Sequence, residues 1–423
     1  MSQPPEPSPL MPLSPMPLAP RPMAMHMALQ TLTWMISVGA LPALRSGSSA
    51  SNPLLPPVGR QLAEKLASTD PVALRRAVER EAGNRLANFA AGVERYHKAP
   101  RHPREQEPPV FWCQGTTRVL DYGLSDEAPP VLLIPSLINR AHILDLDERS
   151  SLARGLAARG FRPLLVEWNG PGEAERQFTL DDYIAGRLVA MLDAVNAETG
   201  HKPALVGYCM GGNLALALAA LRPADVRALA LLATPWDFHA MPAAMTHALA
   251  GVLPAVETAL DVMGTLPVDA LQAMFAGLDP YLTARKFRRF AHAAAHSGAV
   301  ADNGVAEFIA LEDWLNDGVP LAGPVARACL REWYVENRPH QGTWRIGGQA
   351  IRPQDIDLPA LVMVPARDHI VPPASARPLA EALPRARLVE VAAGHIGMVA
   401  GSRARDLLQR PLATWLSENL TRD

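Results

Sequence analysis

Six short apolar runs, each bounded by turn residues, recur along the chain between positions 131 and 391. They show no alternation of polar and apolar side chains, which is typical of strands that helices cover on both faces. The runs occupy residues 131–134, 164–166, 204–206, 228–232, 361–364 and 388–391. Because helical stretches separate them, the pattern predicts an α/β fold with a mostly parallel central sheet flanked by helices.

The first 58 residues follow a different pattern, because proline, methionine, serine and leucine alternate in them. Such a composition does not support regular hydrogen-bonded structure, so we expect most of this leader to be disordered. Residues 23–44 differ from the rest, since they are apolar and lack Lys, Arg, Asp and Glu. His26, Gln30 and Pro42 interrupt this stretch, which favours a surface-binding or loosely helical segment over a membrane helix.

Residues 59–105 combine charged side chains with apolar positions at helical spacing, most clearly over residues 72–80. This pattern predicts a helical N-terminal segment, and the prolines between residues 100 and 109 mark a linker. Residues 106–423 are then expected to form the α/β domain.

Composition excludes several classes of protein. The 40 basic and 42 acidic residues nearly balance, which gives no electrostatic reason to expect nucleic acid or an anionic membrane as partner. Cys113, Cys209 and Cys329 show no paired spacing and no metal-binding motif. We therefore expect free thiols in a reducing, cytoplasmic compartment, and neither a metal ion nor a cofactor.

The clearest chemical signal follows the apolar run at 204–206. It reads Gly207-Tyr208-Cys209-Met210-Gly211, and an alanine- and leucine-rich helical segment continues to residue 220. This is the strand, tight turn and helix of a nucleophile elbow, with cysteine in place of the usual serine. Glycine flanks the apex because a side chain there would collide with the strand or the helix. The alternative interpretation of Cys209 is a buried structural thiol.

An acid and a histidine occur later in the chain, each directly after a predicted strand. Asp368 follows the run at 361–364, and His395 lies in a glycine-flanked loop after the run at 388–391. Taken singly, Asp368 could be a turn residue and His395 a solvated loop residue. Together with Cys209 they give the order nucleophile, acid, histidine that the α/β-hydrolase fold requires. We therefore predict a triad of Cys209, Asp368 and His395.

Rival side chains are disfavoured by their positions. Three acids precede predicted strands rather than follow them, and one histidine is adjacent to the predicted acid and is interpreted as a supporting residue. These are Asp225, Asp355, Asp357 and His369.

Backbone amides are the expected oxyanion donors. In this fold one donor is the residue after the nucleophile, and the other comes from the turn after an early strand. These positions correspond to Met210 and to Leu137, within one position.

The strand pattern stops between Thr234 and about Gly348, where helix-like segments rich in alanine and methionine replace it. An insertion after the strand that follows the nucleophile helix is a usual place for a lid over an active site. We expect a helical lid at about 235–348, with an immobile helical subdomain as the alternative.

These residues resemble the polyhydroxyalkanoate synthases over about residues 108–400. The specific similarities are the box at 207–212 and the segment 368–372, and the segment 394–396 is similar as well. Weaker ones lie at 137–146, 179–183 and 333–337. The resemblance implies a catalytic cysteine, aspartate and histidine matching Cys209, Asp368 and His395. It also implies (R)-3-hydroxyacyl-CoA thioesters as substrates, joined into polyester with release of CoA.

Three departures from that family concern polymerisation more than the catalytic residues. Ala141 and His142 replace a tyrosine pair, the segment 311–320 lacks the family's tryptophan-asparagine pattern, and the leader differs. Two alternatives therefore stay open: a thioesterase or polyester depolymerase with the same triad, and a granule-associated scaffold without activity.

The expected partners follow from the resemblance. They are a hydroxyacyl-CoA substrate and a polyester granule in the cytoplasm, and either a homodimer or a partner subunit is compatible with it. Contact of the leader with a membrane is disfavoured but stays open as an alternative.

Overall fold

The computed structural model describes residues 19–45, 61–62, 65–66, 68–101, 107–240, 243–293 and 299–420. These residues divide between two compact units. The helical unit contains the described residues of 1–101 and 272–312, and the sheet unit contains those of 102–271 and 313–423. Each unit is described by itself below.

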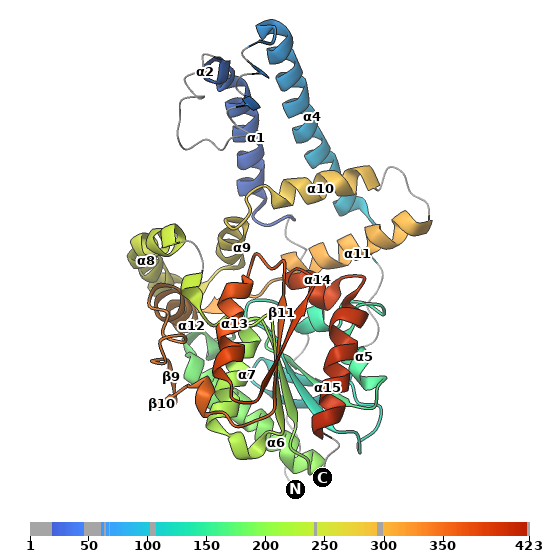
Figure 1. Ribbon diagram of the computed structural model, residues 1–423, viewed down its shortest axis with the longest axis vertical. Coiled ribbons are helices and arrows are strands. Elements are labelled where there is room, and N and C mark those ends of the chain that lie inside the picture. The colour runs from blue at the N-terminus through green and yellow to red at the C-terminus, as the bar shows by residue number, and fades with distance from the viewer. Residues whose placement is uncertain are drawn as a thin grey trace. The chain divides into compact units, whose positions relative to one another are not determined.

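An eight-stranded sheet forms the centre of the sheet unit (Figure 1), with the order β1-β2-β4-β3-β5-β6-β11-β12. The first two pairings in this order are antiparallel and the other five are parallel. The strands are β1 Val110–Gln114, β2 Thr117–Asp121, β3 Pro130–Ile134, β4 Arg162–Glu167, β5 Ala204–Tyr208, β6 Ala228–Leu232, β11 Ala360–Pro365 and β12 Ala386–Val391. The predicted α/β architecture is confirmed.

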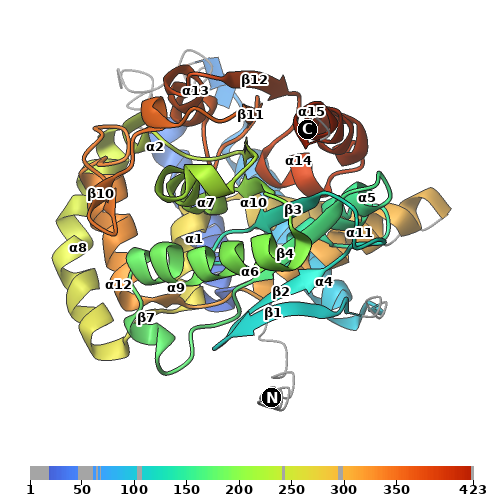
Figure 2. The same ribbon diagram turned by 90° about the horizontal axis from the view of Figure 1, so that it is seen from below.

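Helices cover both faces of this sheet. Figure 2 shows α5, α14 and α15 on one side and α6, α7 and α13 on the other. Their bounds are α5 Leu152–Ala157, α6 Val189–Thr199, α7 Met210–Leu221, α13 Pro373–Ala382, α14 His395–Ala400 and α15 Arg410–Leu420, with π-helical turns η3 Asp182–Leu188 and η8 Arg405–Gln409 before α6 and α15. Strands β3, β4, β5, β6 and β11 are buried along their whole length because both of their faces are covered.

Strand β12 departs from the expectation of two covered faces. It is the edge strand, and most of its side chains are exposed or half-buried, including Leu388 with 42% of its surface accessible. Its apolar residues alone did not distinguish an edge position from a central one.

The described residues of the segment 235–348 are mainly helical. Two pairs of very short antiparallel strands also occur in or beside it, β7 with β8 and β9 with β10, and no pattern in the sequence indicated them. Its elements are α8 Ala243–Met263, β7 Thr265–Leu266, α9 Val268–Ala276, α10 Leu282–Ala293, α11 Ala299–Asn316, β8 Leu321–Ala322, α12 Gly323–Ala328, η6 Cys329–Val335, β9 Arg345–Ile346 and β10 Gln349–Ala350. The insertion is divided between the two units, because residues 272–312 group with the helical unit.

The helical unit is built on the long helix α4 Pro71–Lys98, which α1 Met23–Gly39 and α10 contact. Asp70 caps α4 by accepting a hydrogen bond from the Ala73 amide at 2.7 Å, and Pro71 occupies the first helical position. Edge-to-face aromatic contacts of Phe287 with Phe89 and Tyr96 form its core.

The leader contains helix α1 in the stretch where the sequence favoured a surface-binding or loosely helical segment. Residues 1–18 and 46–58, the rest of the segment expected to be disordered, lie outside the described residues. Among the helices that the structure describes, none combines the length and apolar character needed to cross a membrane.

We predict that alanine substitutions of two leucines, both in apolar runs, differ sharply in their effect on the free energy of unfolding. Leu205→Ala empties a fully buried site in β5 and should lower the free energy of unfolding by about 3 kcal/mol. Leu388→Ala on the edge strand should lower it by less than about 1 kcal/mol. Urea titration followed by circular dichroism measures both, and equal losses would contradict the assignment of β12 as an open edge.

Candidate active site

Cys209 stands at the apex of a sharp bend between β5 and α7. Its backbone has φ 55° and ψ −128°, a combination that residues other than glycine rarely adopt. The bend is held in place because the Cys209 amide donates to the Leu232 carbonyl at 2.9 Å, continuing the ladder between β5 and β6. The half-buried thiol therefore lies at the carboxyl end of the central strand, next to the first turn of α7.

Glycine at position 207 is required by close packing inside this bend. A Cβ atom there would overlap the backbone of Gly211 and Gly212 in the first turn of α7. The structure thus gives the reason for the glycine that precedes Cys209 by two positions.

Asp368 and His395 lie at the carboxyl ends of β11 and β12, as predicted. Nδ1 of the His395 ring is 2.6 Å from Oδ2 of Asp368, and the side chains are almost fully buried. The other carboxylate oxygen accepts hydrogen bonds from the amides of Ile370 at 2.8 Å and Val371 at 2.9 Å. Because these amides hold the carboxylate, it can fix the orientation of the imidazole ring.

The His395 ring also reaches the sulfur of Cys209. Burial by itself would lower the pKa of His395, but the charge of Cys209 and hydrogen bonds to Asp368 and Cys209 raise that pKa to about 10. His395 is hydrogen-bonded to Asp368, and Cys209 lies close enough to His395 to raise its pKa, although the three residues come from positions up to 186 residues apart in the sequence. The structure brings these three predicted residues together.

The two predicted oxyanion donors lie on neighbouring strand ends. Ile134 of β3 pairs with Gly207 of β5, and Leu137 and Met210 each follow their strand partner by three positions. Gly211 lets the two segments approach closely, because a Cβ atom there would overlap the carbonyl oxygens of Ile134 and Pro135. The turn after β3 is thus packed against the amino end of α7, where unpaired amides favour negative charge.

The rival residues take other positions. Asp225 is paired with Arg222 in the turn before β6, and Asp355 and Asp357 lie before β11. His369 is exposed, and the structure does not support its interpretation as a structural or supporting residue of the site.

Two tyrosines near the site were not singled out from the sequence. The Tyr208 ring lies 5.2 Å from the His395 ring, centroid to centroid, and its hydroxyl donates to the His395 carbonyl at 3.3 Å. Tyr334 lies on η6, and burial together with the nearby charges of Cys209 and Cys329 raises its pKa. Tyr208 adjoins the cysteine in the elbow, which was an available signal, whereas Tyr334 becomes a neighbour only through the fold.

No cluster of three or more His, Cys, Asp or Glu side chains is arranged to hold a metal ion in the part of the chain that the structure describes.

Comparisons with known proteins give the family. A family model described as the alpha/beta hydrolase fold matches residues 129–401. The chain is 31% identical over 293 residues to the poly(3-hydroxyalkanoate) polymerase subunit PhaC of Allochromatium vinosum, which covers 68% of this chain and 81% of that protein. It is 30% identical over 298 residues to the subunit of the same name from Synechocystis sp., covering 68% and 78%.

A relative of the same name from Haloarcula marismortui is 31% identical over 301 residues, covering 70% of this chain. The match spans only 62% of that haloarchaeal protein. The matched region of this chain contains the elbow, the acid and the histidine in the order described above. The family expected from the sequence is thereby confirmed: the chain belongs to the poly(3-hydroxyalkanoate) polymerase subunit PhaC family, on the alpha/beta hydrolase fold.

Proposed function

We propose that this chain is an acyltransferase that joins (R)-3-hydroxyacyl units from CoA thioesters into polyester and releases CoA. The observation that carries the proposal is the buried hydrogen bond between His395 and Asp368 beside Cys209 at an elbow, in a chain of the PhaC family. Cys209 is the nucleophile, His395 the general base and acid, and Asp368 the residue that orients the imidazole.

Acylation of Cys209 is the first step. His395 takes the thiol proton, and the raised pKa of its imidazole makes it a stronger base for this step. The sulfur forms a bond to the thioester carbonyl carbon, whose π electrons move to the oxygen. When the carbonyl re-forms, the carbon–sulfur bond to CoA breaks and CoA takes the proton from His395.

Charge on the tetrahedral oxygen needs donors that are already in place. The amides of Met210 and Leu137 supply them in this proposal, supported by the close packing of the β3 turn against α7. Each preorganised donor of this type typically increases kcat by a factor of about 10²–10³.

Transfer to a second hydroxyacyl unit completes the cycle. His395 takes the proton of that unit's 3-hydroxyl group, the oxygen attacks the acyl-enzyme carbonyl, and an ester bond replaces the thioester on Cys209. The bond between the acyl carbon and the Cys209 sulfur breaks, and the leaving sulfur takes the proton from His395, which restores the thiol and the neutral imidazole.

Elongation requires that water be kept from the acyl-enzyme. Within the sheet unit, η6 of the insertion brings Tyr334 close to the Cys209 sulfur, which supports a shielded site. We propose that the parts of the predicted insertion at about 235–348 that belong to the sheet unit, residues 235–271 and 313–348, act as the lid.

The partners are part of the proposal. The relatives are named polymerase subunits, which supports a partner subunit for this chain or assembly with its own copies. We propose a cytoplasmic site of action at the surface of the polyester granule, with no cofactor.

The product assay tests the reaction class. Purified protein incubated with (R)-3-hydroxybutyryl-CoA should release free CoA and accumulate polyester, because the acyl-enzyme is passed to a hydroxyl group. Thiol titration measures CoA, and chromatography separates polymer from free acid. Free 3-hydroxybutyrate as the only product would instead make the chain a hydrolase, and no CoA release would contradict both.

Substitutions test the assigned roles. Cys209→Ala and His395→Ala should abolish the burst of CoA release, because each removes a group without which no acyl-enzyme forms. Asp368→Asn should retain a trace, lower by about 10⁴-fold, because its amide favours the wrong ring tautomer. The matched control is Cys113→Ala, which removes an exposed thiol and should leave the burst unchanged. Full activity in the first three variants would overturn the assignment.

The titration of His395 tests its coupling to the sulfur. Removing the thiol in Cys209→Ala eliminates the charge and one hydrogen bond that raise the pKa of His395, so this pKa should fall from about 10 toward its ordinary value of 6.5. Because the folded pKa is raised, the stabilisation from protonation is complete below about pH 6.5 and is lost as the pH rises through about 10. NMR of the histidine rings, assigned with His395→Gln, measures the change, and equal pKa values in both proteins would show that the groups are not coupled.

A further inference from the structure

The turn between β3 and the 3₁₀ helix η1 Ala141–Leu144 is held at both ends by consecutive residues of β4 and its extension. The Trp168 indole N–H donates to the Pro135 carbonyl at 3.0 Å, where the turn begins. Oε2 of Glu167 accepts a hydrogen bond from the Ala141 amide at 3.1 Å, where the turn ends. Leu137 lies between these two attachment points.

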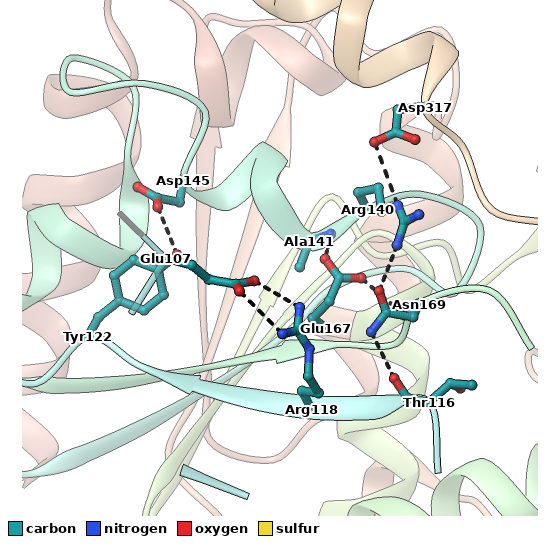
Figure 3. Close-up of polar contacts among 10 residues, drawn as sticks. All are labelled: Glu107, Thr116, Arg118, Tyr122, Arg140, Ala141, Asp145, Glu167, Asn169 and Asp317. Carbon is teal, nitrogen blue, oxygen red and sulfur yellow. Dashed lines mark hydrogen bonds and ion pairs between the residues drawn. The ribbon is translucent and has the colours of Figure 1, made fainter. Parts of the chain in front are cut away.

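Asn169 adds a third attachment. Its side-chain oxygen accepts from the Arg140 guanidinium at 2.6 Å, while its side-chain nitrogen donates to the Thr116 carbonyl at 2.8 Å (Figure 3). Oε1 of Glu167 accepts from the Asn169 amide at 3.1 Å, and the Asn169 backbone has φ 57°. Glu167 therefore fixes Asn169 as well as Ala141, and one carboxylate serves both attachments.

The opposite side of the turn is held by residues 314–319 of the insertion, which belong to the sheet unit. The Trp314 indole N–H donates to the Arg140 carbonyl at 2.9 Å, and the Val319 amide donates to the Ile138 carbonyl at 3.3 Å. Arg140 also pairs with Asp317 at 3.6 Å (Figure 3). These contacts give a purpose to the segment around 311–320, which departs from the family's pattern.

The Glu167 side chain has an unusual setting for a carboxylate. Only 8% of the residue is accessible, and burial raises its pKa, against the amide hydrogen bonds from Asn169 and Ala141 and the positive charge of Arg140. Both oxygens are occupied by backbone amides that would lose their acceptor if the carboxylate were removed. Burying the Glu167 carboxylate costs free energy, which indicates a role for this side chain beyond general packing.

We propose that Glu167 is a positioning residue for acyl transfer: its carboxylate fixes the turn from Pro135 to Ala141 and thereby the Leu137 amide toward the oxyanion. This inference rests on the acyl transfer proposed above. Glu167 does not touch the substrate, and it acts through the turn.

An aldehyde analogue of the acyl group separates this role from a structural one. With 3-hydroxybutanal, the Cys209 sulfur bonds to the aldehyde carbon and the thiol proton passes to the oxygen, giving a tetrahedral adduct whose oxygen occupies the oxyanion position. Alkylation by iodoacetamide forms a sulfur–carbon bond and releases iodide without any oxyanion. The first reaction depends on the donors and the second only on the thiol.

In Glu167→Gln, one oxygen becomes an NH₂ group that faces a backbone donor, so the turn should shift. We expect the inhibition constant of the aldehyde to rise about 10- to 100-fold and kcat for CoA release to fall similarly, with KM and the alkylation rate unchanged. Trp168→Phe removes only the indole donor at the other end of the turn, and it should change the inhibition constant in the same direction. It replaces Glu167→Gln as the test variant if Glu167→Gln folds poorly.

The matched control is Glu175→Gln. Glu175 is also buried, but its partners are the Thr116 amide and Arg187, both outside the turn. It should reduce thermal stability without changing the inhibition constant of the aldehyde.

The outcomes distinguish the positioning role of Glu167 from acyl transfer by Cys209. Wild-type aldehyde affinity in folded Glu167→Gln and Trp168→Phe would overturn the positioning role while leaving acyl transfer intact. An equal loss of affinity in Glu175→Gln would overturn it too, because a general effect of stability would then suffice. If the wild-type protein forms no aldehyde adduct at Cys209, the proposed function fails and this inference fails with it.

Discussion

The buried hydrogen bond between Asp368 and His395 is the interaction on which the site depends. It spans 2.6 Å, and the second carboxylate oxygen is held by two backbone amides, so the imidazole has a fixed orientation toward Cys209. The strained backbone at Cys209 lies at the carboxyl end of β5, at the same edge of the sheet as this ring. Such strain persists only where the surrounding structure enforces it, and here the β5–β6 ladder and the glycines of the elbow do so.

The parallel sheet explains why these parts meet. Strands β3, β5, β6, β11 and β12 run in the same direction, so the segments that follow them emerge at one edge. Cys209, Asp368, His395 and the turn carrying Leu137 all lie at that edge. The same arrangement lets β4 contribute Glu167, Trp168 and Asn169 to hold the turn. A rigid scaffold thus positions groups that a chain of flexible loops could not hold.

The sequence predicted much of this, for identifiable reasons. The apolar runs of β3, β4, β5, β6 and β11 are fully buried strands, and burial on both faces leaves a strong pattern. Asp368 was found because it follows one of these strands, β11, and His395 was found because it follows the apolar run of the edge strand β12. The exposed edge of β12, the short pairs β7–β8 and β9–β10 and the division of the insertion left no periodic signal. Glu167 could not be recognised either, since its partner Ala141 is 26 residues away and the contact exists only after folding.

The central claim is that Cys209 carries the acyl group, and mass spectrometry of the quenched enzyme tests it most directly. After brief incubation with (R)-3-hydroxybutyryl-CoA and acid quenching, peptide mapping should find a hydroxybutyryl group on the peptide that contains Cys209. Acylation of Cys113, Cys329 or a serine in its place, or no acylated peptide while CoA is released, would contradict the account.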